Sequence, residues 1–197
     1  MNKTALFLLI IIMILSSCAT SNLKKYYFSN QTALTKLEHA YKEEYIRKPF
    51  SIEYSDRYFD NISIEIITDS LKLIYGFNRH EKQLNDTLVK YGLNSLRIDS
   101  ILNQMESIGC IWLNKLDYYV DTKKNLLVFM SIRQKSFHIP LTKRKYYIIS
   151  FFDQPQYFDE KGNLLNKRRL KVYRKIHGDI FKRITNKVAY TISDRFR

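Results

Sequence analysis

Four stretches of the chain carry hydrophobic residues at the spacing of an α-helix. The first has its hydrophobic side chains at Leu34, Leu37, Tyr41 and Tyr45. We expect this helix to end near Arg47, because Pro49 disfavours a helical conformation of the residue before it. Two further helices are predicted over residues 78–91 and 95–108, each followed by a glycine that is suited to end it. The fourth predicted helix covers residues 179–193.

Hydrophobic and polar residues alternate between these helices, which is the pattern of β-strands with one buried face. Strands are expected over residues 50–54, 62–66, 71–77, 110–120, 126–132 and 146–152. A turn is expected over residues 158–164, with Gly162 in a conformation of positive φ. We interpret Leu170, Val172 and Ile176 as a further strand.

Helices and hairpins in this order predict an α+β fold. We expect a single domain over residues 32–197, with an antiparallel sheet built from hairpins and about four helices packed on one face. Its last element is expected to be a basic amphipathic helix, with isoleucine and valine side chains on one face and Lys and Arg on the other. The hydrophobic content of 45% and the many Tyr and Phe residues favour a folded chain over a disordered one.

The chain begins with a short positively charged segment, residues 1–3, and an apolar run over residues 5–15. The run leads into the motif Leu15-Ser16-Ser17-Cys18. A positive start, a short hydrophobic core and small residues before a break are the parts of a secretory signal. With a cysteine directly after the small residues, the stretch resembles the signal and lipobox of bacterial lipoproteins. The resemblance implies diacylglyceryl transfer to the Cys18 sulfur, cleavage between Ser17 and Cys18, and fatty acylation of the new amino group.

The apolar run is too short to span a bilayer. Its eleven residues reach about 17 Å as a helix, whereas a hydrocarbon core of about 30 Å needs roughly 20 residues. We therefore expect residues 1–17 to be removed as a signal peptide and residues 18–31 to form a lipidated tether. The acyl chains alone then hold the protein at the membrane. Ala19 rather than Asp follows the cysteine, which in the best-known lipoprotein sorting pattern implies the outer membrane, facing the periplasm.

Positive charge is concentrated in the C-terminal part of the chain. Residues 161–197 carry a net charge of +10, and residues 18–160 only +3. Such a charge strengthens attraction to anionic surfaces at low salt, and the nearest one for a lipid-anchored protein is the membrane. The alternative is that these side chains only keep a polar face soluble. The residues expected to contact the membrane or an anionic partner are Lys167, Arg168, Arg169, Lys171, Arg174, Lys175, Lys182, Arg183 and Lys187.

The sequence contains little that indicates catalysis. Cys110 lies in an apolar segment and is expected to pack in the core. Asp117 and Asp121 share one face of their strand and are interpreted as solvated side chains. No nucleophile motif or phosphate-binding glycine-rich loop is present, and the histidines lack the close spacing of a zinc site. They are His39, His80, His138 and His177.

These observations predict a lipid-anchored envelope lipoprotein with a non-catalytic binding or scaffold role. We expect no metal or cofactor, and a protein or anionic envelope partner rather than nucleic acid, because the protein is predicted to be exported. Two alternatives stay open: an immunity or inhibitor lipoprotein that blocks one cognate protein, and a hydrolase whose site is assembled from distant residues. A cavity that joins a histidine to a carboxylate would favour the hydrolase.

Overall fold

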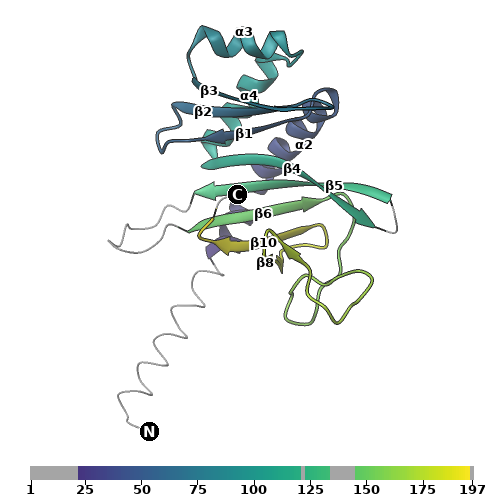
Figure 1. The fold of residues 1–197 in the computed structure, drawn as a ribbon. Helices are drawn as coiled ribbons and strands as arrows, with labels where there is room; N and C mark the ends of the chain where they lie inside the picture. Colours follow the sequence, from purple (N-terminus) through teal and green to yellow (C-terminus); the bar gives the residue numbers. More distant parts are fainter. Residues whose placement is uncertain (1–21, 121–122, 134–144, 196–197) are drawn as a thin grey trace.

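The computed structural model describes residues 22–120, 123–133 and 145–195 (Figure 1). The lipobox, Asp121 and His138 lie outside these residues. The described chain forms a single α+β domain in which helices cover one face of an eight-stranded antiparallel sheet. This arrangement confirms the fold class predicted from the sequence.

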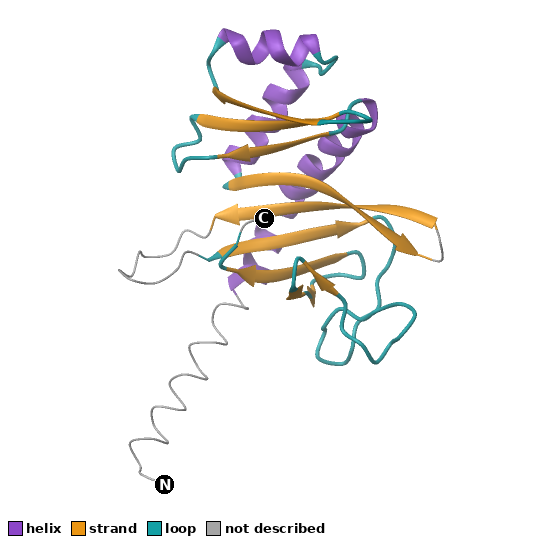
Figure 2. Cartoon of the chain, viewed as in Figure 1, coloured by secondary structure: helices purple, strands orange, loops and turns teal. Residues whose placement is uncertain are grey.

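Four helical segments are described, and they appear in purple in Figure 2. They are residues 22–29, α2 (Gln31–Arg47), α3 (Lys82–Lys90) and α4 (Ser95–Ser107). The side-chain oxygen of Asn94 caps α4 by accepting a hydrogen bond from the Arg97 N–H at 3.1 Å. Gly92 and Gly109 follow α3 and α4 with φ of 74° and 68°. Glycine adopts this conformation without strain, so both helices end where the sequence predicted.

The predicted tether over residues 18–31 is wrong from residue 22 onward, where the described residues begin. Residues 22–29 are helical, and Leu23 and Tyr27 are buried in the core beneath the helices. The hydroxyl of Tyr26 donates a hydrogen bond to the Ile108 carbonyl. Positions 23, 26 and 27 have the i, i+3, i+4 spacing of a helix face, which the polar residues around them concealed.

Ten strands are described. They are β1 (Phe50–Tyr54), β2 (Asn61–Ile67), β3 (Lys72–Asn78), β4 (Cys110–Val120), β5 (Lys123–Arg133), β6 (Tyr146–Phe152), β7 (Lys175–Ile176), β8 (Asp179–Ile180), β9 (Lys182–Arg183) and β10 (Val188–Ser193). The sheet order is β3-β2-β1-β4-β5-β6-β10-β9, and β7 pairs with β8 as a separate hairpin. β1 to β3 form the predicted meander, after which α3 and α4 return the chain to β4 beside β1.

The two faces of the sheet bury two separate hydrophobic cores. On the helix face, side chains such as Ile62 and Ile66 of β2 lie in the larger core with α2 and α4. On the opposite face, Trp112, Phe129 and Phe181 belong to a second core. Phe181 comes from the long segment between β6 and β10, so this segment covers the central strands from the side without helices. Each fully buried side chain of this size contributes roughly 1.5–3 kcal/mol.

The predicted C-terminal helix over residues 179–193 is also wrong, because this stretch forms β8, β9 and β10. The hydrophobic residues that suggested a helix lie four positions apart, a spacing that equally fits the two-residue period of a strand. In β10, Val188 and Tyr190 face the helix-side core, whereas Ala189 faces the second core. Of the strand predicted at Leu170, Val172 and Ile176, only Ile176 lies in a strand, β7. Leu170 and Val172 are exposed outside any strand, so the prediction is wrong for them.

Cys110 packs in the core, as predicted. Its side chain is fully buried, and its Sγ donates a hydrogen bond to the Trp112 carbonyl at 3.3 Å. Burial raises the pKa of the Cys110 thiol to about 12. The neutral thiol is therefore favoured in the folded state.

This raised pKa predicts a loss of stability in alkali. A thiol in the unfolded chain ionises at lower pH than the buried one, so the contribution of Cys110 is complete below about pH 8.5 and is lost as the pH rises towards 12. The difference in unfolding free energy between the parent and Cys110→Ala should shrink by about 3 kcal/mol between about pH 8 and pH 11. Denaturant unfolding at each pH measures this difference. Ionisation of the tyrosines affects both proteins alike and cancels from it. A difference that stays constant with pH would contradict the prediction.

Candidate functional site

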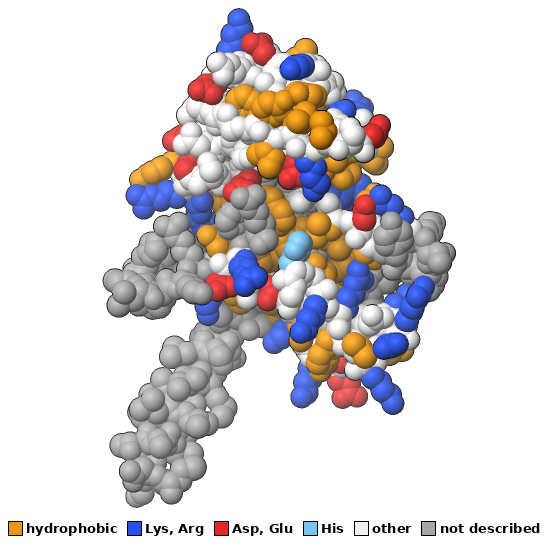
Figure 3. All heavy atoms as spheres, viewed as in Figure 1, with side chains coloured by type: hydrophobic (Ala, Val, Ile, Leu, Met, Phe, Trp, Pro, Cys, Tyr) orange, Lys and Arg blue, Asp and Glu red, His pale blue; other side chains and the backbone are white. Residues whose placement is uncertain are grey.

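All nine predicted contact residues lie in the segment between β6 and β10, residues 154–187, which we call the basic lobe. The basic lobe contains ten Lys and Arg residues against three Asp and Glu. It includes β7, β8 and β9, and it contributes Leu164, Ile176 and Phe181 to the core on the face opposite the helices. Figure 3 shows Lys and Arg side chains distributed around its surface.

Hydrogen bonds between its own turns order the basic lobe. The Leu164 N–H donates to the Phe181 carbonyl at 2.7 Å, and the Arg183 N–H donates to the Gly162 carbonyl at 2.7 Å. The Arg174 N–H donates to the Leu164 carbonyl at 2.9 Å. Gly162 has φ of 79°, which confirms the turn with positive φ that the sequence predicted. Short segments thus hold one another in place although the lobe contains no long strand or helix.

An ion pair fixes the point where the basic lobe leaves the sheet. Asp153, the residue after β6, accepts hydrogen bonds from the Lys42 ammonium at 2.6 Å and from the Leu126 N–H at 3.0 Å. Lys42 belongs to α2 and also pairs with Glu38. Desolvation lowers the pKa of Lys42, but the hydrogen bonds to Asp153 and Glu38 outweigh it and raise that pKa above its usual value. The start of the lobe is therefore tied to α2.

Arg174 differs from the other predicted contact residues because it points inward. Its guanidinium lies 4.9 Å from the Tyr118 ring centre and 5.8 Å from that of Phe152, and it donates to Gln156 Oε1 at 3.2 Å. Burial lowers the pKa of Arg174, and Tyr118 acts in the opposite direction. A guanidinium stays charged at neutral pH even so. Arg174 thus connects the lobe to the aromatic face of the sheet and does not lie on the lobe's outer surface.

Residues 166–173 form a compact exposed segment, which we call the basic loop. The Val172 N–H donates to the Arg169 carbonyl at 2.8 Å, and the Asn166 N–H donates to the Val172 carbonyl at 2.8 Å. Its exposed cations are Lys167, Arg168, Arg169 and Lys171. Leu170, Val172 and Tyr173 are 54%, 47% and 46% exposed. The basic loop therefore presents cations and apolar side chains together on an ordered backbone.

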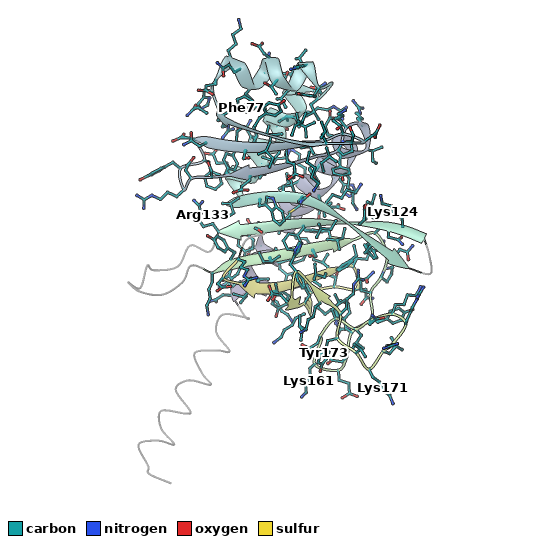
Figure 4. All side chains as sticks on the ribbon, viewed as in Figure 1. Phe77, Lys124, Arg133, Lys161, Lys171 and Tyr173 are labelled. Carbon is teal, nitrogen blue, oxygen red and sulfur yellow. The ribbon has the colours of Figure 1, made fainter. Side chains whose placement is uncertain are left out.

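The remaining predicted residues are exposed on or beside the small strands. Lys175 belongs to β7, Lys182 and Arg183 to β9, and Lys187 precedes β10. Lys161 is exposed in the basic lobe as well, although it was not among the nine predicted contact residues. Figure 4 shows Lys161, Lys171 and Tyr173 at the same end of the molecule, far from Phe77 of β3. Of the predicted set, eight side chains are thus exposed on the lobe and Arg174 alone is directed inward.

One acidic side chain of the basic lobe is engaged internally. Asp159 accepts hydrogen bonds from the Asn163 N–H at 2.7 Å and from the Asn163 side-chain amide at 2.8 Å. Desolvation acts to raise the pKa of Asp159, but hydrogen bonds from Asn163 and Tyr173 prevail and lower it. The carboxylate that stabilises this turn is therefore ionised at neutral pH and directed towards the lobe.

The structure also contains the histidine–carboxylate arrangement that would favour a hydrolase, but in a small hollow. His177 and Asp179 line a space of about 100 Å³ together with Ser193, above Phe129. His177, with φ of 50°, and Gly178 form the two-residue turn between β7 and β8. Within the described residues, no hydrogen bond or ion pair joins His177 to Asp179 or to Ser193. A nucleophile and its base need such a bond, so this hollow gives the hydrolase little support.

Metal binding and membrane crossing also bear on function. No group of three His, Cys, Asp or Glu side chains lies close enough to hold a metal ion within residues 22–120, 123–133 and 145–195. None of the helices in this part of the chain combines the length and hydrophobicity needed to cross a bilayer. Asp117 is exposed and pairs with Lys124 at 2.7 Å, in line with its interpretation as a solvated side chain.

Comparison of the chain with known protein families, curated proteins and solved structures finds no match.

Proposed function

We propose that the protein is a bacterial envelope lipoprotein, anchored by lipid at Cys18, whose basic lobe holds the domain against an anionic membrane surface. Its role in this proposal is binding or scaffolding, not catalysis, and its site is the periplasmic side of the outer membrane. The observation that carries the proposal is the basic loop, where four exposed cations accompany three partly exposed apolar side chains. Proteins that lie in a membrane interface combine these two kinds of side chain.

The position of the first described helix supports this orientation. Residues 22–29 pack on β6 from the helix face, with the rings of Tyr27 and Phe151 6.4 Å apart. The basic lobe packs on β6 from the other face through Arg174 and Phe152. Cys18 precedes residue 22 by four positions, a distance of at most about 14 Å in an extended chain. Acyl chains on Cys18 would therefore bring the end of the sheet that carries the lobe close to the bilayer.

The acyl chains on Cys18 and the cations of the basic loop both contribute to the free energy of membrane attachment in this proposal. Buried acyl chains contribute about 0.8 kcal/mol per methylene, and stable attachment needs more than one signal. A Lys or Arg near an anionic leaflet adds about 1 kcal/mol, and salt weakens this attraction. In this proposal the lipid fixes the protein to the membrane, and the basic loop fixes the orientation of the domain.

The immunity or inhibitor alternative is favoured by exposed apolar side chains at the other end of the molecule. Leu96 on α4 and Val89 on α3 are 82% and 63% exposed. Figure 1 shows α3 at the end of the sheet opposite the basic lobe. Exposed apolar side chains of this kind suit a protein partner, and a single stoichiometric partner that is recovered by crosslinking in intact cells would favour this alternative.

The lipid anchor is tested by metabolic labelling with a radioactive fatty acid. The parent should be labelled and Cys18→Ser should not, because serine offers no thiol for the thioether. Cys110→Ala is the matched control and should be labelled like the parent, since that thiol is buried. A Cys18→Ser variant as heavily labelled as the parent would exclude this anchor.

Membrane contact by the basic loop is tested by vesicle flotation of residues 18–197 carrying Cys18→Ser, which removes the acyl site and keeps every described residue. Binding to phosphatidylglycerol vesicles should be strong at low salt, weak at high salt and absent on neutral vesicles. Replacing Lys167, Arg168, Arg169 and Lys171 by Gln should weaken binding at least about a hundredfold, since each of the four charges contributes about 1 kcal/mol.

The control for this experiment removes the same charge elsewhere. Lys36, Arg47, Lys82 and Lys90 are exposed and lie outside the basic lobe. Replacing these four by Gln should weaken binding far less than the loop variant. Equal effects of the two quadruple variants would show that net charge, and not the basic loop, determines membrane binding.

A further inference from the structure

A hollow of about 300 Å³ lies beside the basic loop. It is lined by Gln154, Pro155, Gln156, Tyr157 and Lys167. The first four follow β6 directly, and Lys167 belongs to the basic loop. Pockets for small ligands begin at about this volume. The hollow is therefore large enough for the polar headgroup of a lipid.

Hydrogen bonds to neighbouring residues fix the residues that line the hollow. The Gln156 N–H donates to the Asn186 carbonyl at 2.8 Å, and the Gln156 side-chain amide donates to the Gln154 carbonyl at 2.8 Å. Gln156 Oε1 accepts the hydrogen bond from the inward-pointing Arg174. The Tyr157 carbonyl accepts from the Leu165 N–H at 2.8 Å. A ligand would meet a wall that is already ordered, so little entropy is lost in forming the site.

The chemistry of the lining favours an anion. Lys167 contributes an ammonium group, Gln154 contributes an amide, and none of the five lining residues is acidic. The cations of the basic loop follow Lys167 directly in the chain. Tyr157 is 47% exposed and adds an aromatic surface for carbon atoms of the ligand. A phosphate ester combines a negative charge for Lys167 with an alcohol portion for Tyr157.

We infer that this hollow binds the phosphate headgroup of an anionic phospholipid, with Lys167 pairing with the phosphate. The inference rests on the proposed membrane contact and makes it specific. A lipid is favoured over a soluble phosphate ester because Leu170, Val172 and Tyr173 are partly exposed on the same loop. These apolar side chains suit the region beneath the headgroups, whereas a soluble ligand would leave them in water.

The test compares two single variants of the basic loop that remove the same charge. Lys167→Gln changes a residue that lines the hollow, and Lys171→Gln changes an exposed residue of the same loop outside it. On phosphatidylglycerol vesicles, with residues 18–197 carrying Cys18→Ser, the Lys171 variant should lose about fivefold in affinity, as expected for one interfacial charge. The Lys167 variant should lose at least about fivefold more, because a charge-assisted hydrogen bond is lost as well.

The possible results separate this inference from the proposed function. Equal losses in the two variants would overturn the headgroup site and leave membrane contact by the loop intact. If neither these variants nor the quadruple loop variant weakens binding, the proposed function fails together with the inference. Thermal unfolding of both variants should match the parent, because both side chains are exposed.

A competition experiment identifies the source of the phosphate. Glycerol phosphate should displace the parent from the vesicles more effectively than sulfate at equal ionic strength, and Lys167→Gln should remove that difference. Equal displacement by the two anions would indicate diffuse attraction and overturn the inference. If glycerol phosphate binds as tightly as the vesicles do and Leu170→Ser leaves vesicle binding unchanged, the ligand is a soluble phosphate ester and the lipid assignment is wrong.

Discussion

Burial of the central strands on both faces is the constraint on which the rest of the structure depends. All but the first residue of β6 are buried, with Tyr147, Ile149 and Phe151 in the helix-side core and Ile148 and Phe152 in the second core. Antiparallel sheets commonly leave one face to water. Here the second face is apolar at β4, β5 and β6, so it needs a cover, and the basic lobe supplies it.

This requirement explains how a segment with little regular structure keeps a fixed shape. Leu164 and Phe181 are buried in the second core, and the backbone hydrogen bonds of the lobe lie around them. Arg174 adds a contact with two aromatic rings, and the pair between Lys42 and Asp153 holds the first turn. Loops of this length are usually either functional or disordered. Because Leu164 and Phe181 are buried in the second core, the basic lobe is ordered. Its cations therefore have a defined arrangement.

The sequence predicted the features of the fold that depend on local pattern. Alternation predicted the long strands, and glycines marked the ends of α3 and α4. The C-terminal helix was wrong because a spacing of four residues fits both a helix and a strand, and the partner strand β6 decides between them only in the folded chain. The tether was wrong because Leu23 and Tyr27 become a buried face only when β6 lies beneath them.

The candidate site was predictable as a concentration of charge but not as a shape. Counting residues located the nine cations, since charge composition needs no tertiary information. The inward direction of Arg174 depends on Tyr118 and Phe152, which come from other strands. The hollow beside Lys167 likewise depends on how the lobe folds back on residues 154–157, which precede Lys167 by ten to thirteen positions. No local signal in the chain brings these groups together.

The central claim, that the second core orders the basic lobe, is tested most directly by backbone hydrogen exchange. In the parent, the amides of Leu164, Arg174 and Arg183 should be protected, because each donates to a lobe carbonyl. Phe181→Leu should speed their exchange by about fivefold while protection in α2 and β2 stays unchanged, since local opening follows the loss of about 1 kcal/mol of packing. Unprotected lobe amides in the parent, or protection unaffected by Phe181→Leu, would contradict the account.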